Sequence, residues 1–122
     1  MQISKDTTKI PFRIRSYEPG KVVINDQILT SSVIISKISL IQDWSPQQVS
    51  DLSIACFDKL LACQAKLILF GTGEKQHFPH PSLYANLLTH GITIEFMNTK
   101  AACHTFNVLM SEDRDVACAL LL

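Results

Sequence analysis

A glycine turn directly after an apolar run is the first pattern in the sequence that could bind a ligand. The turn consists of Gly71, Thr72 and Gly73. It follows the predicted buried strand 67–70, and glycines at such a position leave backbone N–H groups open to a phosphate, as in dinucleotide-binding proteins. That fingerprint fails here, because Gln76 occupies its third glycine position and Pro79 and Pro81 prevent an immediate helix. We therefore assign the glycines to a tight turn and expect no cofactor.

The second candidate is the predicted start of a helix at Asn98 or Thr99. The first turn of this helix contains Lys100 and no acidic residue. Its free N–H groups and positive pole are therefore open to a small anion. Asn and Thr are also common helix caps, and simple capping explains the same residues. The two interpretations are compatible, because a cap can leave other N–H groups for a ligand.

Other reactive residues give no catalytic or metal site. Cys103 and His104 fall near the start of the same helix, but neighbouring helical residues point about 100° apart and cannot face each other as nucleophile and base. His77 and His80 supply only half of a tetrahedral metal site. The charged turn at residues 112–115 is typical of a solvated helix end. We predict no catalytic residues and no metal ligands, and lean towards a protein that is not an enzyme.

Composition limits the classes of protein that are possible. The chain has 122 residues, 47% of them hydrophobic and 18% charged, which indicates a single α/β domain over residues 1–122. A net charge of zero disfavours nucleic-acid binding and makes a homo-oligomer plausible. No apolar run approaches the roughly 20 residues of a membrane span, and the N-terminus lacks a signal pattern, so we expect no membrane insertion and a cytoplasmic location. Four cysteines without metal or redox spacing are predicted to be reduced, mostly buried thiols: Cys56, Cys63, Cys103 and Cys118.

The hydrophobic pattern changes from strand-like to helical along the chain. Ile10, Phe12 and Ile14 alternate with polar residues, and short β-branched runs follow at 22–24 and 33–35, separated by turn residues. This predicts an N-terminal antiparallel β-meander. The later pattern predicts a long helix over 46–64, a strand over 67–70, a helix over 81–90, a strand over 92–97, a helix over 99–111 and a strand over 116–121.

Alternating strands and helices in the last two thirds of the chain predict a largely parallel central sheet with flanking helices. The fold class is therefore α/β, with the meander as an added layer. Loops that leave the carboxyl ends of parallel strands meet at one edge of a sheet. We accordingly expect residues 71–76 and residues 98–100 to be close neighbours.

Several stretches together resemble a small domain family of unknown function, which includes a mitochondrial assembly factor for respiratory complex I and the vertebrate adipogenesis-associated protein. The stretches are W-S-P at 44–46, F-G-T-G at 70–73, G-I at 91–92, M-N-T-K-A-A-C-H-T-F-N-V-L at 97–109 and E-D-R-D-V-A-C-A-L at 112–120. The resemblance implies a compact α/β domain with an added β-layer. It also implies a candidate pocket formed by Gly71, Thr72, Gly73, Asn98, Thr99, Thr105 and Asn107.

Two functions remain open at this point. The resemblance and the missing catalytic residues favour a non-enzymatic interaction or assembly-type protein that binds another protein. The alternative is a small-anion or small-molecule binding domain, or an enzyme, that uses the Gly71 turn and the helix start at Asn98. A polar pocket at that place would favour the second.

Overall fold

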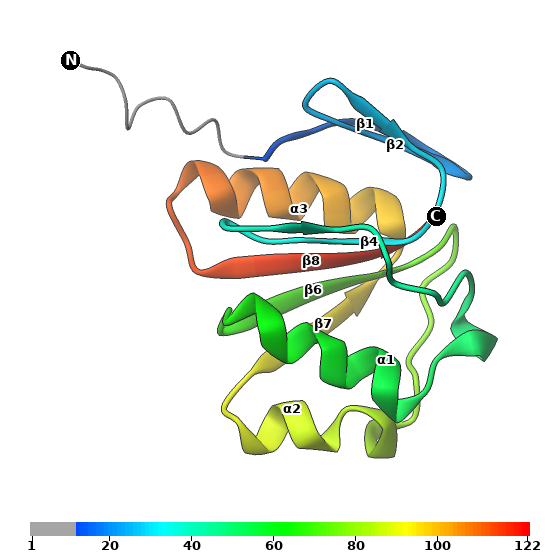
Figure 1. The fold of residues 1–122 in the computed structure, drawn as a ribbon, viewed down its shortest axis with the longest axis vertical. Helices are drawn as coiled ribbons and strands as arrows, with labels where there is room; N and C mark the ends of the chain where they lie inside the picture. The colour runs from blue at the N-terminus through cyan, green and yellow to red at the C-terminus, as the bar shows by residue number, and fades with distance from the viewer. Residues whose placement is uncertain (1–11) are drawn as a thin grey trace.

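The computed structural model describes residues 12–122, which form a three-stranded and a five-stranded β-sheet with helices on the larger sheet (Figure 1). The predicted start of the first strand at Ile10 lies outside these residues. The strands are β1 (Ile14–Glu18), β2 (Lys21–Ile24), β3 (Gln27–Leu29), β4 (Val33–Ile35), β5 (Leu40–Ile41), β6 (Leu67–Thr72), β7 (Thr93–Met97) and β8 (Val116–Leu121). The α-helices are α1 (Ile54–Asp58), α2 (Ala85–Thr89) and α3 (Thr99–Ser111), and the 3-10 helices are η2 (Val49–Asp51), η3 (Lys59–Cys63) and η4 (Pro81–Leu83).

The larger sheet has the strand order β5-β4-β8-β6-β7. Its central strand β6 runs parallel to both neighbours, so that Leu69 is paired with Glu95 of β7 and Cys118 of β8. β4 and β5 extend this parallel core with antiparallel pairs. The predicted α/β class is confirmed, and the carboxyl ends of β6 and β7 lie side by side.

The three-stranded sheet is an antiparallel meander, as predicted, with the order β1-β2-β3. Its third strand β3 was not predicted, and the run at 33–35 instead forms β4 of the larger sheet. The turn between β1 and β2 contains Pro19 and Gly20, and Gly20 has a φ of +85°, which glycine adopts without strain. β1 contains a β-bulge: Ile14 pairs with Ile24 while Ser16 pairs with Val23. Arg15 is therefore one extra residue on this strand.

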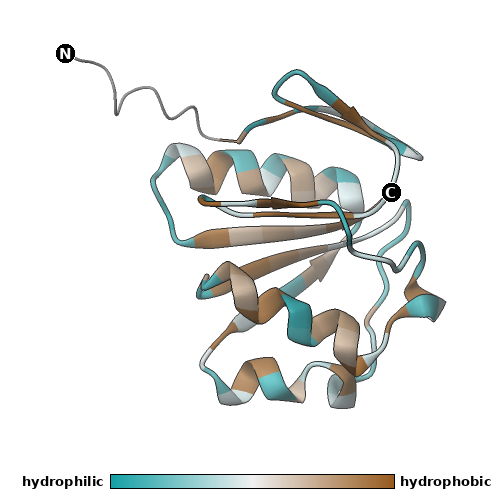
Figure 2. Ribbon diagram, viewed as in Figure 1, coloured by the Kyte–Doolittle hydropathy of each residue, from teal (hydrophilic) through white to brown (hydrophobic). Residues whose placement is uncertain are grey.

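The two faces of the larger sheet are covered differently. α1 and α2 lie on one face, and α3 and the meander lie on the other (Figure 1). Figure 2 shows apolar residues concentrated along β6 and β8, which are covered on both faces, and polar residues in the loops. β8 is buried along its whole length. Because both of its faces are covered, its sequence is a continuous apolar run without polar alternation.

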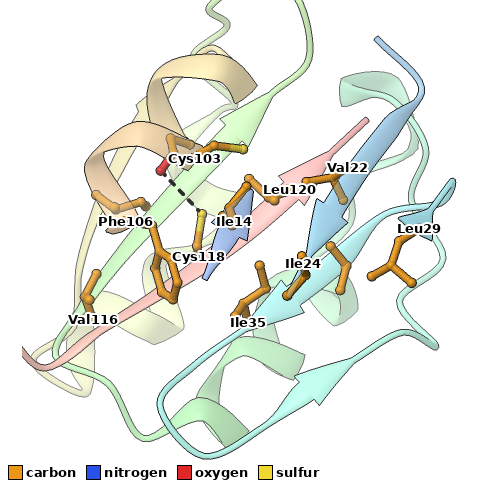
Figure 3. Packing of buried hydrophobic residues seen from close by; sticks show 13 residues of the cluster. Ile14, Val22, Ile24, Leu29, Ile35, Cys103, Phe106, Val116, Cys118 and Leu120 are labelled. Carbon is orange, nitrogen blue, oxygen red and sulfur yellow. Dashed lines mark hydrogen bonds between the residues drawn. The ribbon is translucent and has the colours of Figure 1, made fainter. Parts of the chain in front are cut away.

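The meander and α3 share one hydrophobic core with the sheet (Figure 3). Ile14 and Ile24 of the meander and Phe106 of α3 contribute buried side chains to it. On the other face an aromatic cluster surrounds Phe70, with ring centroids 5.1 Å away at Phe57 and 5.3 Å away at Phe96. Both cores are built against β6 and therefore hold its glycine end in a fixed position.

The predicted long helix over residues 46–64 is wrong. The segment contains η2, then a break, then α1 and η3. The break occurs because Leu52 is extended, with φ −70° and ψ 138°, and Ser53 begins a new helix by accepting a hydrogen bond from the Cys56 N–H. Ser side chains compete for backbone groups in this way and favour helix starts over helix interiors. The longest helix within residues 12–122 is α3, with 13 residues.

Candidate functional site

The glycine turn and the start of α3 are neighbours, as the sequence predicts. The Gly73 N–H donates to Thr99 Oγ1 at 2.8 Å, and the Thr99 N–H donates to the Gly73 carbonyl at 2.8 Å. This reciprocal pair follows from the parallel arrangement of β6 and β7, because the loops leaving both strands start at the same edge. The site therefore begins with two hydrogen bonds that join the glycine turn to Thr99.

Thr99 is a structural residue at this contact. Its side chain is fully buried, and its hydroxyl donates to the Leu121 carbonyl at 2.6 Å while accepting from Gly73. A Cβ atom on Gly71 would lie only 2.9 Å from the Cα and the Oγ1 of Thr99. Gly71 is therefore required for close packing of β6 against α3, and neither residue presents a free group to a ligand.

Thr72 is also occupied by the backbone. Its hydroxyl accepts from the His77 N–H at 3.1 Å, and its single proton is directed at two carbonyl oxygens, that of Lys75 at 2.7 Å and that of Met97 at 3.1 Å. The side chain is buried. It fixes the loop that follows Gly73 across the end of β7, and its hydroxyl is not available to a ligand.

A polar cavity of about 310 Å³ opens beside this contact. Of the candidate residues, Gly73 and Asn98 line it, together with Lys100, while the Asn98 side chain caps α3 by accepting from the Ala101 N–H at 2.8 Å. The other lining residues come from the β1–β2 hairpin and the loop after β6 and were not predicted: Tyr17, Glu18, Pro19 and Glu74. The two carboxylates disfavour a simple anion, because they offset the charge of Lys100 and the positive pole of α3.

Tyr17 is the least satisfied polar group of this cavity. Its hydroxyl oxygen is buried and has no hydrogen-bond partner in residues 12–122. Burial, with smaller contributions from Glu74 and Cys103, raises the pKa of the Tyr17 hydroxyl. The hydroxyl is therefore a neutral donor and acceptor at physiological pH. The β1–β2 hairpin lies far from the glycine turn in the sequence, and no local pattern would have placed Tyr17 at this cavity.

Asn107 and Thr105 lie farther along α3, away from the glycine turn. The Asn107 amide binds the backbone of β1, with its Oδ1 accepting from the Ile14 N–H at 3.0 Å and its Nδ2 donating to the Ile14 carbonyl at 2.7 Å. The Asn107 amide therefore makes the two hydrogen bonds that a neighbouring strand would otherwise make with Ile14, on the edge of β1 that does not pair with β2. Thr105 is half-buried and does not line the cavity at the turn. The structure brings Gly73 and Asn98 together at a cavity and separates Thr105 and Asn107 from it.

The cysteines are free thiols, and three of them are buried, in agreement with the sequence. Burial raises the pKa of the Cys103 thiol to about 12 and that of Cys63 to about 11. Cys118 donates to the Ala102 carbonyl at 3.8 Å within the core (Figure 3). The thiolate is the reactive form, so these residues are poor nucleophiles at neutral pH.

The two histidines of the loop before α2 do not form a metal site with other residues. His80 Nδ1 accepts from the Ser82 N–H at 3.1 Å and thereby begins η4. Residues 12–122 contain no group of three or more His, Cys, Asp or Glu side chains positioned to hold a metal ion.

Comparison with known proteins places the chain in a family. Residues 14–121 match the family described as "Protein of unknown function (DUF498/DUF598)", and the chain belongs to this family. The solution structure of a Xanthomonas campestris protein is 36% identical, with a TM-score of 0.84, over 99% of this chain and 92% of that one. The fold and the family resemblance expected from the sequence are therefore confirmed.

Two relatives carry names that describe a role or a location. The zebrafish (Danio rerio) NADH dehydrogenase [ubiquinone] 1 alpha subcomplex assembly factor 3 is 32% identical over 88% of this chain, which spans 63% of that protein. A "13 kDa major membrane protein" of Francisella tularensis is 25% identical over 99% of both chains. The family thus includes assembly factors. In this chain, no helix within residues 12–122 is long and apolar enough to cross a membrane.

Proposed function

We propose that this chain is a non-enzymatic, assembly-type protein that binds an extended segment of a protein partner along strand β7. The observation that carries the proposal is the outer edge of β7, the last strand of the larger sheet, which pairs with no other strand within residues 12–122. The relationship to a complex I assembly factor supports the class of function. The commitment of the Thr72 and Thr99 hydroxyls to backbone groups argues against catalysis at the glycine turn.

The direction of each backbone group on β7 follows from its register. The Thr93 N–H donates to the Lys66 carbonyl at 2.9 Å, so Thr93, Glu95 and Met97 direct their backbone groups towards β6. Ile94 and Phe96 direct theirs outwards. Within residues 12–122, the Ile94 N–H, the Ile94 carbonyl and the Phe96 N–H have no hydrogen-bond partner, and only the Phe96 carbonyl is bonded, to Gln76 Nε2 at 2.9 Å.

An edge of this kind is a template for another strand. Unpaired N–H and C=O groups in a row gain hydrogen bonds when an extended peptide adds to the sheet. The side chain of Glu95 is exposed next to this edge, so it can select among partners by charge. The cytoplasmic location expected from the sequence stays a prediction.

The proposal is tested by two substitutions at one position. Ile94→Pro removes the outward N–H and breaks no hydrogen bond to β6, whereas Ile94→Ala removes more of the side chain and keeps the N–H. We expect the tagged wild-type protein and Ile94→Ala to capture the same partner from native lysate, and Ile94→Pro to lose at least about 90% of it, a loss of about 1.4 kcal/mol of binding energy.

Equal capture by the proline and alanine variants would exclude strand addition at β7. Capture of a second copy of the chain would instead identify the predicted homo-oligomer, whose mass light scattering would measure directly. Circular dichroism of both variants shows whether each is folded before its capture is interpreted.

A second candidate function is binding of a small molecule in the cavity at the glycine turn. The observation that favours it is a cavity lined by Tyr17, Lys100 and Glu74. The Tyr17 hydroxyl is buried and has no hydrogen-bond partner within residues 12–122. Groups of both charges beside a neutral hydroxyl suit a zwitterionic ligand better than the small anion expected from the sequence.

A thermal-shift comparison of glycine, acetate and inorganic phosphate tests this candidate. We expect glycine at 100 times its dissociation constant to add about 2.7 kcal/mol of stability. Tyr17→Phe and Lys100→Gln should abolish the shift, while Lys66→Gln, which lies outside the cavity, should keep it. A shift that persists in Tyr17→Phe and Lys100→Gln, or no shift with glycine, would reject the cavity as the site.

A further inference from the structure

A second cavity of about 310 Å³ lies at the other end of the contact between β1 and α3. It is separate from the glycine turn and shares none of its lining residues. Arg13 and Arg15 line it on the meander side, and Met110 lines it on the side of α3. We propose that this cavity binds a small organic carboxylate whose carboxylate group pairs with the two arginines and whose apolar part contacts Phe12 and Met110.

The charge of the cavity supports an anionic group. No aspartate or glutamate lines it, in contrast to the cavity at the glycine turn. Both arginines are exposed, and within residues 12–122 neither guanidinium has a carboxylate within ion-pair distance. Guanidinium groups bind carboxylates through paired, charge-assisted hydrogen bonds.

One neutral polar side chain of the cavity, Asn25, also presents a donor. Asn25 Oδ1 already accepts from the Arg13 N–H at 2.9 Å, and Asn107 Oδ1 already accepts from the Ile14 N–H at 3.0 Å. The carbonyl ends of both amides are thus directed at the protein backbone. The Asn25 amide NH₂ has no bond within residues 12–122 and remains free to donate to a ligand oxygen.

The fold fixes the positions of Arg13 and Arg15, because Ile14 between them is anchored in the core. Ile14 points into the core beside Cys118 and Leu120 (Figure 3), and Asn107 binds its backbone on both sides. The bulge in β1 then inserts Arg15 as an extra residue after Ile14. Bulges re-aim side chains in this manner, and here both arginines line one cavity.

The apolar lining selects the kind of anion. Phe12 and Met110 are partly buried against the core and give the cavity an apolar wall. Inorganic phosphate would leave this wall in contact with water, whereas an aromatic carboxylate such as benzoate would cover it. The expected preference is therefore benzoate over inorganic phosphate and over the neutral analogue benzyl alcohol.

Titration of the ¹⁵N-labelled full chain with benzoate tests the proposal. We expect the side-chain amide signals of Asn25 and Asn107 to shift, with an affinity at least tenfold weaker in the double variant Arg13→Gln, Arg15→Gln. Arg114→Gln is the matched control, because Arg114 is an exposed arginine outside the cavity. It should bind benzoate as the wild type does.

Four results would overturn the proposal. They are no shift of the Asn25 and Asn107 signals at a benzoate concentration of about 10 mM, equal binding by the double variant, equal binding of benzyl alcohol, and equal binding of inorganic phosphate.

Discussion

Thr99→Val should lower the free energy of unfolding by about 3 kcal/mol, because it leaves two buried backbone groups without a partner. The hydroxyl of Thr99 accepts from the Gly73 N–H and donates to the Leu121 carbonyl, and valine has nearly the same shape but no hydroxyl. The side chain is fully buried, so water cannot replace these bonds. Urea unfolding followed by circular dichroism measures the change.

Thr99→Ser is the matched control for this substitution. Serine keeps the hydroxyl and loses one buried methyl group, which costs about 1 kcal/mol. Equal destabilisation by serine and valine would mean that packing of the methyl group matters and that the two hydrogen bonds do not. The structural role assigned to Thr99 would then be wrong.

Gly71→Ala should destabilise the protein by about 3 kcal/mol, near the upper end for overpacking. The added Cβ would lie 2.9 Å from the Cα of Thr99, a backbone atom that cannot rotate away, and 3.2 Å from a methyl group of Leu120. The clash can be relieved only if α3 moves away from β6. Thermal unfolding should show a midpoint lower by about 10 °C.

Gly73→Ala separates this steric effect from backbone strain. Gly73 has a φ of +99°, and a Cβ there would contact nothing within 4 Å. Its substitution should cost about 1–2 kcal/mol through strain alone. A larger loss at Gly73 than at Gly71 would contradict the close approach of β6 and α3.

The sequence was sufficient to predict the fold class and the proximity of the glycine turn to the start of α3. Apolar runs alternating with helical patterns indicate parallel strands, and parallel strands bring their outgoing loops to one edge. The contact between Gly73 and Thr99 follows from that rule alone. Asn98 was predictable as a cap because its side chain acts on the nearest free N–H groups, three residues away.

Contacts between distant segments could not be predicted in the same way. Tyr17 reaches the cavity at the glycine turn because the meander folds onto α3, a packing choice that no local pattern encodes. The same holds for Asn107, which binds Ile14 93 residues earlier. The interrupted helix after Trp44 was mispredicted because Ser53 acts as a helix cap inside an otherwise helical pattern.

Hydrogen exchange of the β7 amides tests the central claim, strand addition at β7, most directly. In the free chain, the Ile94 and Phe96 amides should exchange quickly, while Thr93, Glu95 and Met97 are protected by their bonds to β6. In the complex captured from lysate, exchange at Ile94 and Phe96 should slow at least tenfold. Unchanged exchange at both amides, with new protection elsewhere on the chain, would contradict the proposed function.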